Sequence, residues 1–378
     1  MNKKRLLMVS PCCGVLSVGR ICTDIALEWE SKGYEVKIGY GRIPNIPHKY
    51  RRFGVRIGNM AGVYLHALIS LLFGYHATGW CSLWATRKFI KWAEEWNPQV
   101  LWLHNLHDNY VNVVELFRWI KTRPNMKVFW TQHDFWAMTG GCTYTMDCEN
   151  WRKGCPSCPA GIRNRRRGLF GGSERREFQI KKRAFLGVKD MTLICPSRWL
   201  ADSFKESYLS CYPIEVVKNT VDKTVFKPTK SDFRGQYGLE ECKIILSVAG
   251  FWESPTKGFD DLIRLSALVN KDMKIVVVGL PKQMLKGLPA NMIGIGRTNS
   301  ASELAGIYTT ADVFFNPTKL DNFPTVNLEA RACECPIITY DSGGCKETVE
   351  GYDKAIVLSG ADKTPKGFME AAKKAGFI

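Results

Sequence analysis

The chain has 378 residues, enough for two domains that each bury a core of their own. Its apolar fraction of 45% and charged fraction of 24% are those of a folded globular protein, and they exclude a wholly disordered chain. The formal net charge of +17 favours anionic partners such as phosphates, nucleic acid or acidic lipid. The chain has 14 cysteines, and its N-terminus lacks the apolar run of a signal peptide. Together these features predict reduced thiols and a cytoplasmic location.

The first third of the chain has the pattern of a doubly wound α/β domain. A strand is predicted over residues 5–10, then a small-residue loop over 11–19, a helix over 20–32 and a second strand over 34–40. Strands and helices that alternate in this way predict a parallel sheet. The other elements predicted for a first domain, residues 1–196, are a helix over 85–96 and strands over 100–104, 127–131 and 191–196.

The most apolar segment covers residues 61–73 and contains one histidine. It is shorter than the roughly 20 residues that a membrane-spanning helix needs. We therefore expect a buried helix here. A helix that lies in a membrane interface is the alternative, because Lys and Arg flank the segment.

A second α/β series predicts a second domain over residues 197–378. It has no short-period repeat and no low-complexity tract. Its predicted strands cover 243–248, 274–279, 313–316 and 336–340, and its predicted helices cover 259–269, 301–309 and 326–333.

Two carboxylates lie eight positions apart in Asp321-Asn322-Phe323-Pro324-Thr325-Val326-Asn327-Leu328-Glu329. The predicted elements place Asp321 in a loop and Glu329 on the helix that follows it. Ionised carboxylates accept hydrogen bonds from the paired hydroxyls of a sugar or a ribose. The start of the helix adds backbone N–H groups, which favour phosphate. The alternative is a pair of solvated carboxylates beside a helix.

This segment and the later Ser342-Gly343-Gly344-Cys345-Lys346-Glu347 resemble the signature of retaining nucleotide-sugar glycosyltransferases of the GT-B type, family 4 (glycosyl transferases group 1). The resemblance covers nearly the whole chain. It implies two Rossmann-like domains that face each other across a cleft, with the acceptor side in 1–196 and the nucleotide-sugar side in 197–378. It also implies transfer of a sugar, with retained anomeric configuration, to a glycan or lipid-linked oligosaccharide in exopolysaccharide, capsule or O-antigen synthesis.

The resemblance implies roles for single residues of the second domain. Asp321 would read the donor sugar, Glu329 would bind the ribose, and Lys257 before Gly258 would stabilise the leaving diphosphate. A solvated surface lysine is the alternative at position 257, and the arginine that many members carry on the preceding strand end is missing. Glu347 would support the cleft. The backbone near the phosphate would come from Asn322, Phe323, Thr325 and Val326.

Two features of the first domain are further candidates. The loop over 13–19, which includes Gly19, could bring its backbone close to donor phosphate or to the acceptor, although a plain tight turn explains the same glycines. His133 follows the strand over 127–131, at the edge of a parallel sheet where ligands bind. The resemblance places His133 and Asp134 beside the reacting sugar, and a structural histidine is the alternative. A second histidine cluster, over 103–108, suits the lining of an acceptor site.

Cys142, Cys148, Cys155 and Cys158 form C-x5-C-x6-C-x2-C in a cysteine-rich loop over 139–160. Four thiolates can enclose a structural zinc ion, and disulfides or buried thiols are the alternatives. The resemblance adds that such a cluster occurs in a polysaccharide-synthesis branch of colanic-acid type. There it follows Thr-x-His-Asp-x-Trp-x-x-Thr-Gly, here residues 131–140. Catalysis itself is expected to need no metal, since the chain has no Asp-x-Asp motif.

A basic loop over 161–183 precedes and enters a helix, and its residues 163–183 hold nine Lys/Arg against two Glu. It is either a solvated loop or a segment attracted to acidic lipid headgroups, which would place the protein at the inner face of the plasma membrane.

Two other functions fit parts of the sequence. One is a sugar-nucleotide epimerase or hydrolase on the same fold. The other is a basic nucleic-acid-binding protein with a zinc knuckle, which would leave Asp321 and Glu329 unexplained.

The chain departs from the family pattern at two further places. Glu334 occupies a position where the family usually has glycine. The family also carries a long C-terminal helix that crosses back onto the first domain, and the sequence ends at Ile378 before such a helix is predicted.

Overall fold

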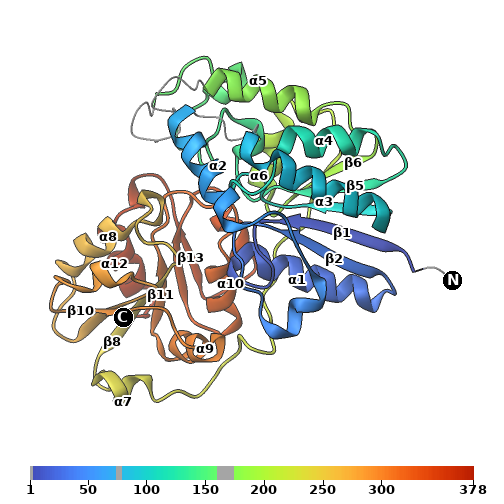
Figure 1. The fold of residues 1–378 in the computed structure, drawn as a ribbon. Coiled ribbons are helices and arrows are strands. Elements are labelled where there is room, and N and C mark those ends of the chain that lie inside the picture. Colours follow the sequence, from blue (N-terminus) through green and yellow to red (C-terminus); the bar gives the residue numbers. More distant parts are fainter. Residues whose placement is uncertain (1–2, 74–78, 160–173) are drawn as a thin grey trace. The chain divides into compact units, whose positions relative to one another are not determined.

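The computed structural model describes residues 3–73, 79–159 and 174–378 of the chain (Figure 1). Contacts divide it into two compact units. Unit 1 comprises Met1–Pro196 and Leu200–Val217, and unit 2 comprises Ser197–Trp199 and Lys218–Ile378. Residues 200–217 therefore cluster with unit 1, whereas the sequence analysis assigned them to the second domain.

The sheet of unit 1 has seven strands in the order β3-β2-β1-β4-β5-β6-β7. All neighbouring strands are parallel, and the chain moves outward from β1 to β3 and then from β4 to β7 on the other side. Its strands are β1 Arg5–Ser10, β2 Glu35–Tyr40, β3 Gly54–Arg56, β4 Val100–Leu103, β5 Lys127–Thr131, β6 Met191–Cys195 and β7 Ile214–Val216.

The helices of unit 1 connect these parallel strands, as such a sheet requires (Figure 1). They are α1 Leu16–Ser31, α2 Met60–Phe73, α3 Leu83–Trp96, α4 Val113–Lys121, α5 Glu174–Phe185 and α6 Arg198–Lys205, of which Arg198 and Trp199 cluster with unit 2. Short 3-10 turns occur at η1 His48–Phe53, η2 Trp80–Ser82, η3 Trp136–Met138 and η4 Asn150–Lys153. Helix α1 begins four residues before the predicted start, so the predicted loop over 11–19 is shorter than expected.

The sheet of unit 2 repeats this topology with six parallel strands in the order β10-β9-β8-β11-β12-β13. The strands are β8 Lys243–Val248, β9 Met273–Val278, β10 Met292–Ile295, β11 Val313–Asn316, β12 Ile337–Tyr340 and β13 Ala355–Leu358. The helices are α7 Phe233–Tyr237, α8 Phe259–Ser266, α9 Ala301–Thr310, α10 Thr325–Ala332, α11 Cys345–Thr348 and α12 Pro365–Lys374, with 3-10 turns at η6 Pro255–Lys257, η7 Lys282–Leu285 and η8 Gly360–Asp362.

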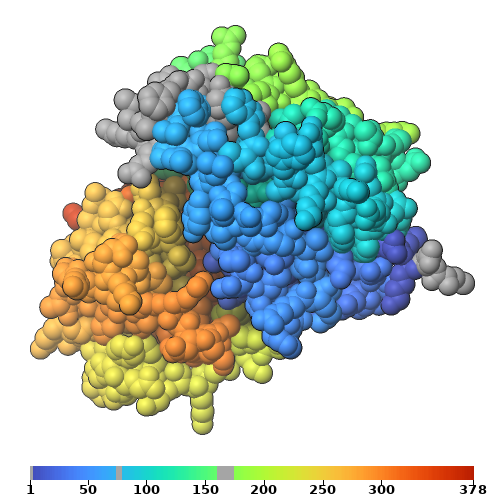
Figure 2. Space-filling view, in the orientation of Figure 1, coloured from blue at the N-terminus to red at the C-terminus, as the bar shows by residue number. Residues whose placement is uncertain are grey.

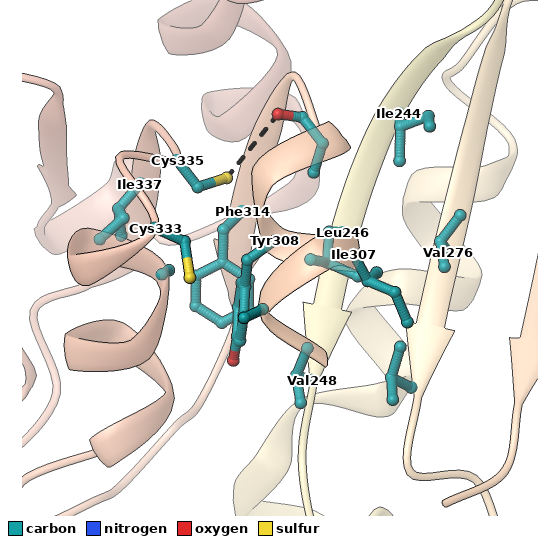
Figure 3. Packing of buried hydrophobic residues seen from close by; sticks show 14 of the residues in the cluster. Ile244, Leu246, Val248, Val276, Ile307, Tyr308, Phe314, Cys333, Cys335 and Ile337 are labelled. Atoms are coloured by element: carbon teal, nitrogen blue, oxygen red, sulfur yellow. Dashed lines mark hydrogen bonds between the residues drawn. The ribbon is translucent and has the colours of Figure 1, made fainter. Parts of the chain in front are cut away.

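Successive side chains of a strand point to opposite faces, so each strand of unit 2 supplies two cores. Phe314 of β11 is fully buried on one face, where it packs with Tyr308 of α9 and with Leu246 of β8 (Figure 3). Phe315 is fully buried on the other face, and its ring packs at a tilt against Phe368 of α12, with 4.2 Å between ring centroids. The last helix of the chain is thus part of the core of unit 2.

The two parallel, doubly wound sheets confirm the predicted fold class. The most central strands begin or end within one residue of their predicted positions, because their apolar runs are continuous. Strands β3, β7, β10 and β13 were not predicted, and they lie toward the edges of the sheets, where the apolar signal is weaker.

Helix α2 corrects the prediction of a buried helix at residues 61–73. Only Val63, His66 and Ser70 of this helix are buried, while several of its large apolar side chains are exposed. Among the described residues, no helix is long and apolar enough to cross a membrane.

Glu334, the departure from the family glycine, has a φ of 59°. This left-handed conformation directly follows the end of α10, where glycine is favoured because it has no Cβ. The exposed glutamate therefore carries a backbone strain of about 1–2 kcal/mol that glycine would not.

The packing in Figure 3 predicts the effect of truncating the central aromatic residue. We expect Phe314→Ala to lower the free energy of unfolding of unit 2 by about 3–5 kcal/mol, because it leaves a cavity in a close-packed core. Urea unfolding measures this change. Phe251→Ala is the matched control, since Phe251 is 62% exposed and its truncation should change stability by less than about 0.5 kcal/mol. Equal effects of the two substitutions would contradict the assignment of this core.

Candidate active site

The order of the strands in unit 2 reverses between β8 and β11, which are neighbours in the sheet. Loops that leave the carboxyl ends of two such strands diverge and leave a crevice where ligands bind in this fold class. Lys257 lies in the loop after β8, and Asp321 lies in the loop after β11. The Lys257 Nζ atom lies 2.6 Å from Asp321 Oδ2, and the two side chains are 24% and 16% exposed. The structure therefore brings these two predicted site residues together.

The two loops are tied to each other next to this ion pair. The carbonyl oxygen of Thr256 accepts a hydrogen bond from the backbone N–H of Lys319 at 2.7 Å and from the Thr318 hydroxyl at 2.9 Å. Gly258 has a φ of 75° and lies so close to the Pro317 carbonyl that a Cβ atom would overlap it. The loops are thus held at a fixed separation, which positions the charges of Lys257 and Asp321 before any ligand binds.

Gly343 and Gly344 pack against the backbone of the loop that contains Asp321. The backbone N–H of Gly344 donates to the Asp321 carbonyl at 2.9 Å, and Gly343 forms a parallel bridge with Asp321. A Cβ atom on Gly343 would overlap the Asp321 carbonyl, and one on Gly344 would overlap the Asn322 carbonyl. The Gly-Gly of the sequence motif is therefore required by close backbone packing.

Glu329 lies on α10, just over one turn after the helix begins. The Tyr308 hydroxyl donates a hydrogen bond to Glu329 Oε2 at 3.2 Å. Burial, together with the charge of Glu329, raises the pKa of Tyr308 well above its usual value, so this hydroxyl stays a donor. The bond fixes the direction of a half-buried carboxylate.

Asn327 was missed by the sequence analysis, although it lies between the two carboxylates. It is fully buried; its Oδ1 accepts from Asn316 Nδ2 at 2.9 Å, and its Nδ2 donates to the Thr348 hydroxyl at 2.8 Å. The side chain therefore ties α10 to the end of β11 and to α11. A buried polar residue on the inner face of a short helix is the signal that could have identified it.

The other predicted donor residues differ in exposure. Asn322 and Phe323 are buried, at 3% and 5% exposed, so their contribution to a ligand would come from the backbone. Thr325 and Val326 are half-buried and begin α10, where the N–H groups have no partner within the helix. Both oxygens of Glu347 accept from the backbone, at 2.8 Å from each of the Arg198 and Trp199 nitrogens.

In unit 1, four polar residues gather after the carboxyl ends of β4 and β5. His104 Nδ1 lies 3.1 Å from His133 Nε2, and His107 Nε2 lies 2.8 Å from Asp134 Oδ2. The backbone N–H of Trp136 donates to Asp134 Oδ1 at 2.8 Å. The predicted His133-Asp134 pair and the second histidine cluster are therefore one connected group.

The His104–His133 pair and the His107–Asp134 pair differ in charge state. Burial lowers the pKa of His133 to about 4, against the opposing effect of Asp134, and burial lowers the pKa of His104 as well. Burial would also lower the pKa of His107, but Asp134 and Asp108 outweigh it and raise this pKa to about 10. At neutral pH the group thus holds an ionised His107–Asp134 pair beside two neutral imidazoles.

Gly19 lies in unit 1 within α1, not in a loop. Its carbonyl accepts a hydrogen bond from the Gly14 N–H at 3.0 Å, and a Cβ atom at position 19 would lie 2.9 Å from Cys12 Sγ. Close packing between α1 and the preceding turn accounts for this glycine, and its predicted place near donor phosphate stays a prediction.

The four-cysteine zinc site stays a prediction. Among the described residues, which include all four cysteines, no three His, Cys, Asp or Glu side chains are grouped so that they could hold a metal ion. Cys155 is buried, and its Sγ accepts a hydrogen bond from the Gly140 N–H at 3.1 Å, whereas Cys142, Cys148 and Cys158 are half-buried. All fourteen cysteines lie among the described residues, and none of them forms a disulfide.

Much of the predicted basic loop, residues 160–173, lies outside the described residues. The rest belongs to α5, where not every basic residue faces solvent. Lys181 is fully buried, and its Nζ donates to the Trp136 carbonyl at 2.5 Å.

The charge state of His107 predicts a pH dependence of stability. The protonated ring forms the ion pair, and its pKa rises from 6.5 in the unfolded chain to about 10 in the folded protein. The contribution of the pair is therefore full below about pH 6.5 and is lost as the pH rises through about 10. We expect the stability difference between wild type and His107→Gln, from urea unfolding, to shrink between about pH 7 and 10.

His48→Gln is the control for this experiment, because His48 is exposed. Its difference from wild type should be small, because the side chain is exposed. A His107→Gln difference that is constant over the same range would contradict the ionised pair.

Comparisons with known proteins agree with this architecture. The family model described as "Glycosyltransferase Family 4" matches residues 18–225, and the model described as "Glycosyl transferases group 1" matches residues 229–374. In structure, the chain is similar to sucrose-phosphate synthase from Thermosynechococcus elongatus, with a TM-score of 0.69, 13% identity and coverage of 99% of this chain and 91% of that one. WaaG, a glycosyltransferase involved in lipopolysaccharide biosynthesis, gives a TM-score of 0.60 at 13% identity, with 98% and 90% covered.

Among curated relatives, the putative colanic acid biosynthesis glycosyl transferase WcaC of Escherichia coli (strain K12) is 23% identical over 262 residues, 67% of this chain and 62% of the relative. The D-inositol 3-phosphate glycosyltransferase of Rhodococcus erythropolis is 27% identical over 165 residues, 39% of this chain and 37% of that relative. The matches thus span less than two thirds of the length of these relatives. Because one family model alone matches more than half of the chain, the protein belongs to Glycosyltransferase Family 4.

Proposed function

We propose that the protein is a retaining glycosyltransferase that moves a sugar from a nucleoside diphosphate sugar to a glycan or lipid-linked acceptor. The observation that carries this proposal is the Lys257–Asp321 pair at the strand-order reversal of unit 2, with Glu329 on the adjoining helix. This arrangement combines a cation with two carboxylates at the edge of the sheet where nucleotides bind in this fold class. Family membership adds the type of reaction.

Lys257 is proposed to bind the diphosphate of the donor. An ammonium group has three N–H donors, so its bond to Asp321 does not prevent a second bond to a phosphate oxygen. A positive charge held in place by two tied loops stabilises the negative charge that grows on the leaving diphosphate. The backbone N–H groups at Thr325 and Val326 add to this stabilisation, because they start a helix.

Asp321 and Glu329 are proposed to bind hydroxyl groups of the donor. Asp321 accepts hydrogen bonds from the donor sugar, and Glu329, which Tyr308 holds in place, accepts them from the ribose diol. In unit 1, His133 is neutral at pH 7 and suits contact with a sugar hydroxyl, since a neutral imidazole is both donor and acceptor.

The proposed reaction needs no protein nucleophile. The acceptor oxygen forms a bond to the anomeric carbon on the face that the phosphate leaves, and the bond from that carbon to the phosphate oxygen breaks. The proton of the acceptor hydroxyl passes to the departing diphosphate oxygen. The anomeric configuration is therefore retained, and no metal is proposed for this step.

The names of similar proteins favour a donor and a pathway. Anabaena Alr3699/HepE, whose structure with UDP-glucose is similar to this chain with a TM-score of 0.59 at 13% identity (99% of this chain and 92% of that one), suggests UDP-glucose as the first donor to test. WcaC suggests polysaccharide biosynthesis, in agreement with the exopolysaccharide, capsule or O-antigen role that the motifs imply.

The test is turnover of UDP-glucose, GDP-mannose and related donors, measured as release of the nucleoside diphosphate, with the first-formed sugar product followed by NMR. We expect Glu329→Gln to raise the donor KM about 10–100-fold, because it removes a charge-assisted hydrogen bond worth about 1.5–3 kcal/mol. Its melting temperature should stay close to that of the wild type.

Glu370→Gln is the matched control, since Glu370 is exposed on α12 of the same unit. It should leave turnover unchanged. Full activity of Glu329→Gln would contradict the assignment of this residue. A product with inverted configuration would contradict the retaining reaction, and an epimerised donor would indicate the alternative enzyme on this fold.

A further inference from the structure

In helix α2 of unit 1, the buried face is mostly polar and the exposed face is apolar, which is the reverse of an ordinary surface helix. Its buried face is formed by Val63, His66 and Ser70, so two of the three buried side chains are polar. Its exposed face is apolar, with exposed fractions of 64% for Tyr64, 49% for Leu65, 50% for Leu68, 42% for Leu71 and 40% for Phe73. A helix that packs a soluble core normally buries such leucines and exposes its polar residues.

This orientation of α2 is fixed by specific contacts. His66 Nδ1 lies 2.7 Å from the Ser82 hydroxyl oxygen, and the Ser70 hydroxyl donates to Asn109 Oδ1 at 3.2 Å. Gly79 packs so closely on the His66 ring that a Cβ atom would overlap it. Rotation of the helix to bury its leucines would break both hydrogen bonds, so the leucines stay exposed.

Two tryptophans extend the exposed apolar surface. Trp80 and Trp84 are 69% and 77% exposed, and they flank Ser82, the partner of His66. Trp84 also lines, with Val63 of α2, a cavity of about 220 Å³. The apolar face, defined as the exposed side chains of α2 with Trp80 and Trp84, thus spans two neighbouring elements. Figure 2 shows the light-blue segment that contains α2 at the molecular surface.

The segment around the apolar face carries charge of only one sign. Residues 41–93 contain no Asp or Glu, and they contain eight basic residues. Arg52 and Arg87 pair with Glu30 and Glu115, which lie outside this segment. The eight basic residues are Arg42, Lys49, Arg51, Arg52, Arg56, Arg87, Lys88 and Lys91.

We propose that the apolar face docks on the surface of a lipid bilayer that contains anionic lipids. Leucines and aromatic rings enter the boundary between headgroups and acyl chains, tryptophan being favoured at this depth. The basic residues are attracted to the negative surface potential. At 14 residues, α2 is about 21 Å long, too short to span the ~30 Å hydrocarbon layer, so it lies in the interface.

A bilayer fits the charges of this region better than a second copy of the chain does. Two copies joined through this face would each contribute residues 41–93, a segment that has eight basic residues and no acidic one. Such like-charge contact opposes association, whereas anionic lipid favours it.

The test is cosedimentation of the full chain with vesicles of phosphatidylcholine alone or with about one third phosphatidylglycerol. We expect binding to the anionic vesicles that weakens as salt rises. The triple variant Leu65→Ser, Leu68→Ser, Leu71→Ser should bind at least about tenfold more weakly, since it removes three apolar side chains from the face. These residues are exposed, so the variant should fold.

The matched control replaces three leucines of similar exposure elsewhere, Leu27→Ser, Leu268→Ser and Leu285→Ser, which are 40%, 40% and 37% exposed. It should bind vesicles as the wild type does. Equal binding by both triple variants would overturn the proposal, as would absence of binding by the wild type. A wild-type dimer that the first triple variant converts to a monomer, without vesicle binding, would assign the face to self-association instead.

A second measurement reports the depth of insertion. Brominated lipids quench tryptophans that enter the acyl region, and we expect quenching in the wild type to be reduced in Trp80→Phe, Trp84→Phe while vesicle binding is retained. Unchanged quenching would overturn the assignment of these two side chains. Neither measurement requires sugar transfer, so the proposal can fail independently of the proposed function.

Discussion

The ion pair between Lys257 and Asp321 depends on one topological constraint, the reversal of strand order between β8 and β11. Residues 64 positions apart meet because the loops after these two strands diverge from the same edge of the sheet. Thr256 and Gly258 tie the first loop to the second, and the glycines after β12 support the second from the other side. The charges are thus held by backbone contacts, so their placement does not depend on flexible side chains alone.

The fold and the candidate site in unit 2 could be predicted largely from sequence, because their signals are local. Continuous apolar runs locate β8 and β11, and the spacing from Asp321 to Glu329 follows from a loop that enters a helix. The unusual Glu334 is also explained locally, since its positive φ is the conformation for which glycine is favoured. What the sequence did not reveal is Asn327, whose role depends on two partners, Asn316 and Thr348, that only the folded structure brings to it.

Unit 1 shows where sequence patterns mislead. The apolar run of α2 suits a core helix, but hydrogen bonds to His66 and Ser70 turn its leucines outward. Composition alone gives the wrong environment for this helix, because side-chain hydrogen bonds set its orientation. The sequence also did not reveal the ionised His107–Asp134 pair, because the charge state of this pair depends on burial in the folded structure.

The central claim is that Lys257 binds the diphosphate of a nucleotide-sugar donor. Calorimetric titration of UDP, GDP, ADP and CDP into wild type, Lys257→Met and Lys366→Met tests it most directly; Lys366 is an exposed lysine of the same unit. We predict that one nucleotide binds wild type and Lys366→Met equally, and binds Lys257→Met at least about tenfold more weakly through loss of charge-assisted hydrogen bonds. Equal binding to all three proteins, or binding of no nucleotide to the wild type, would contradict the claim.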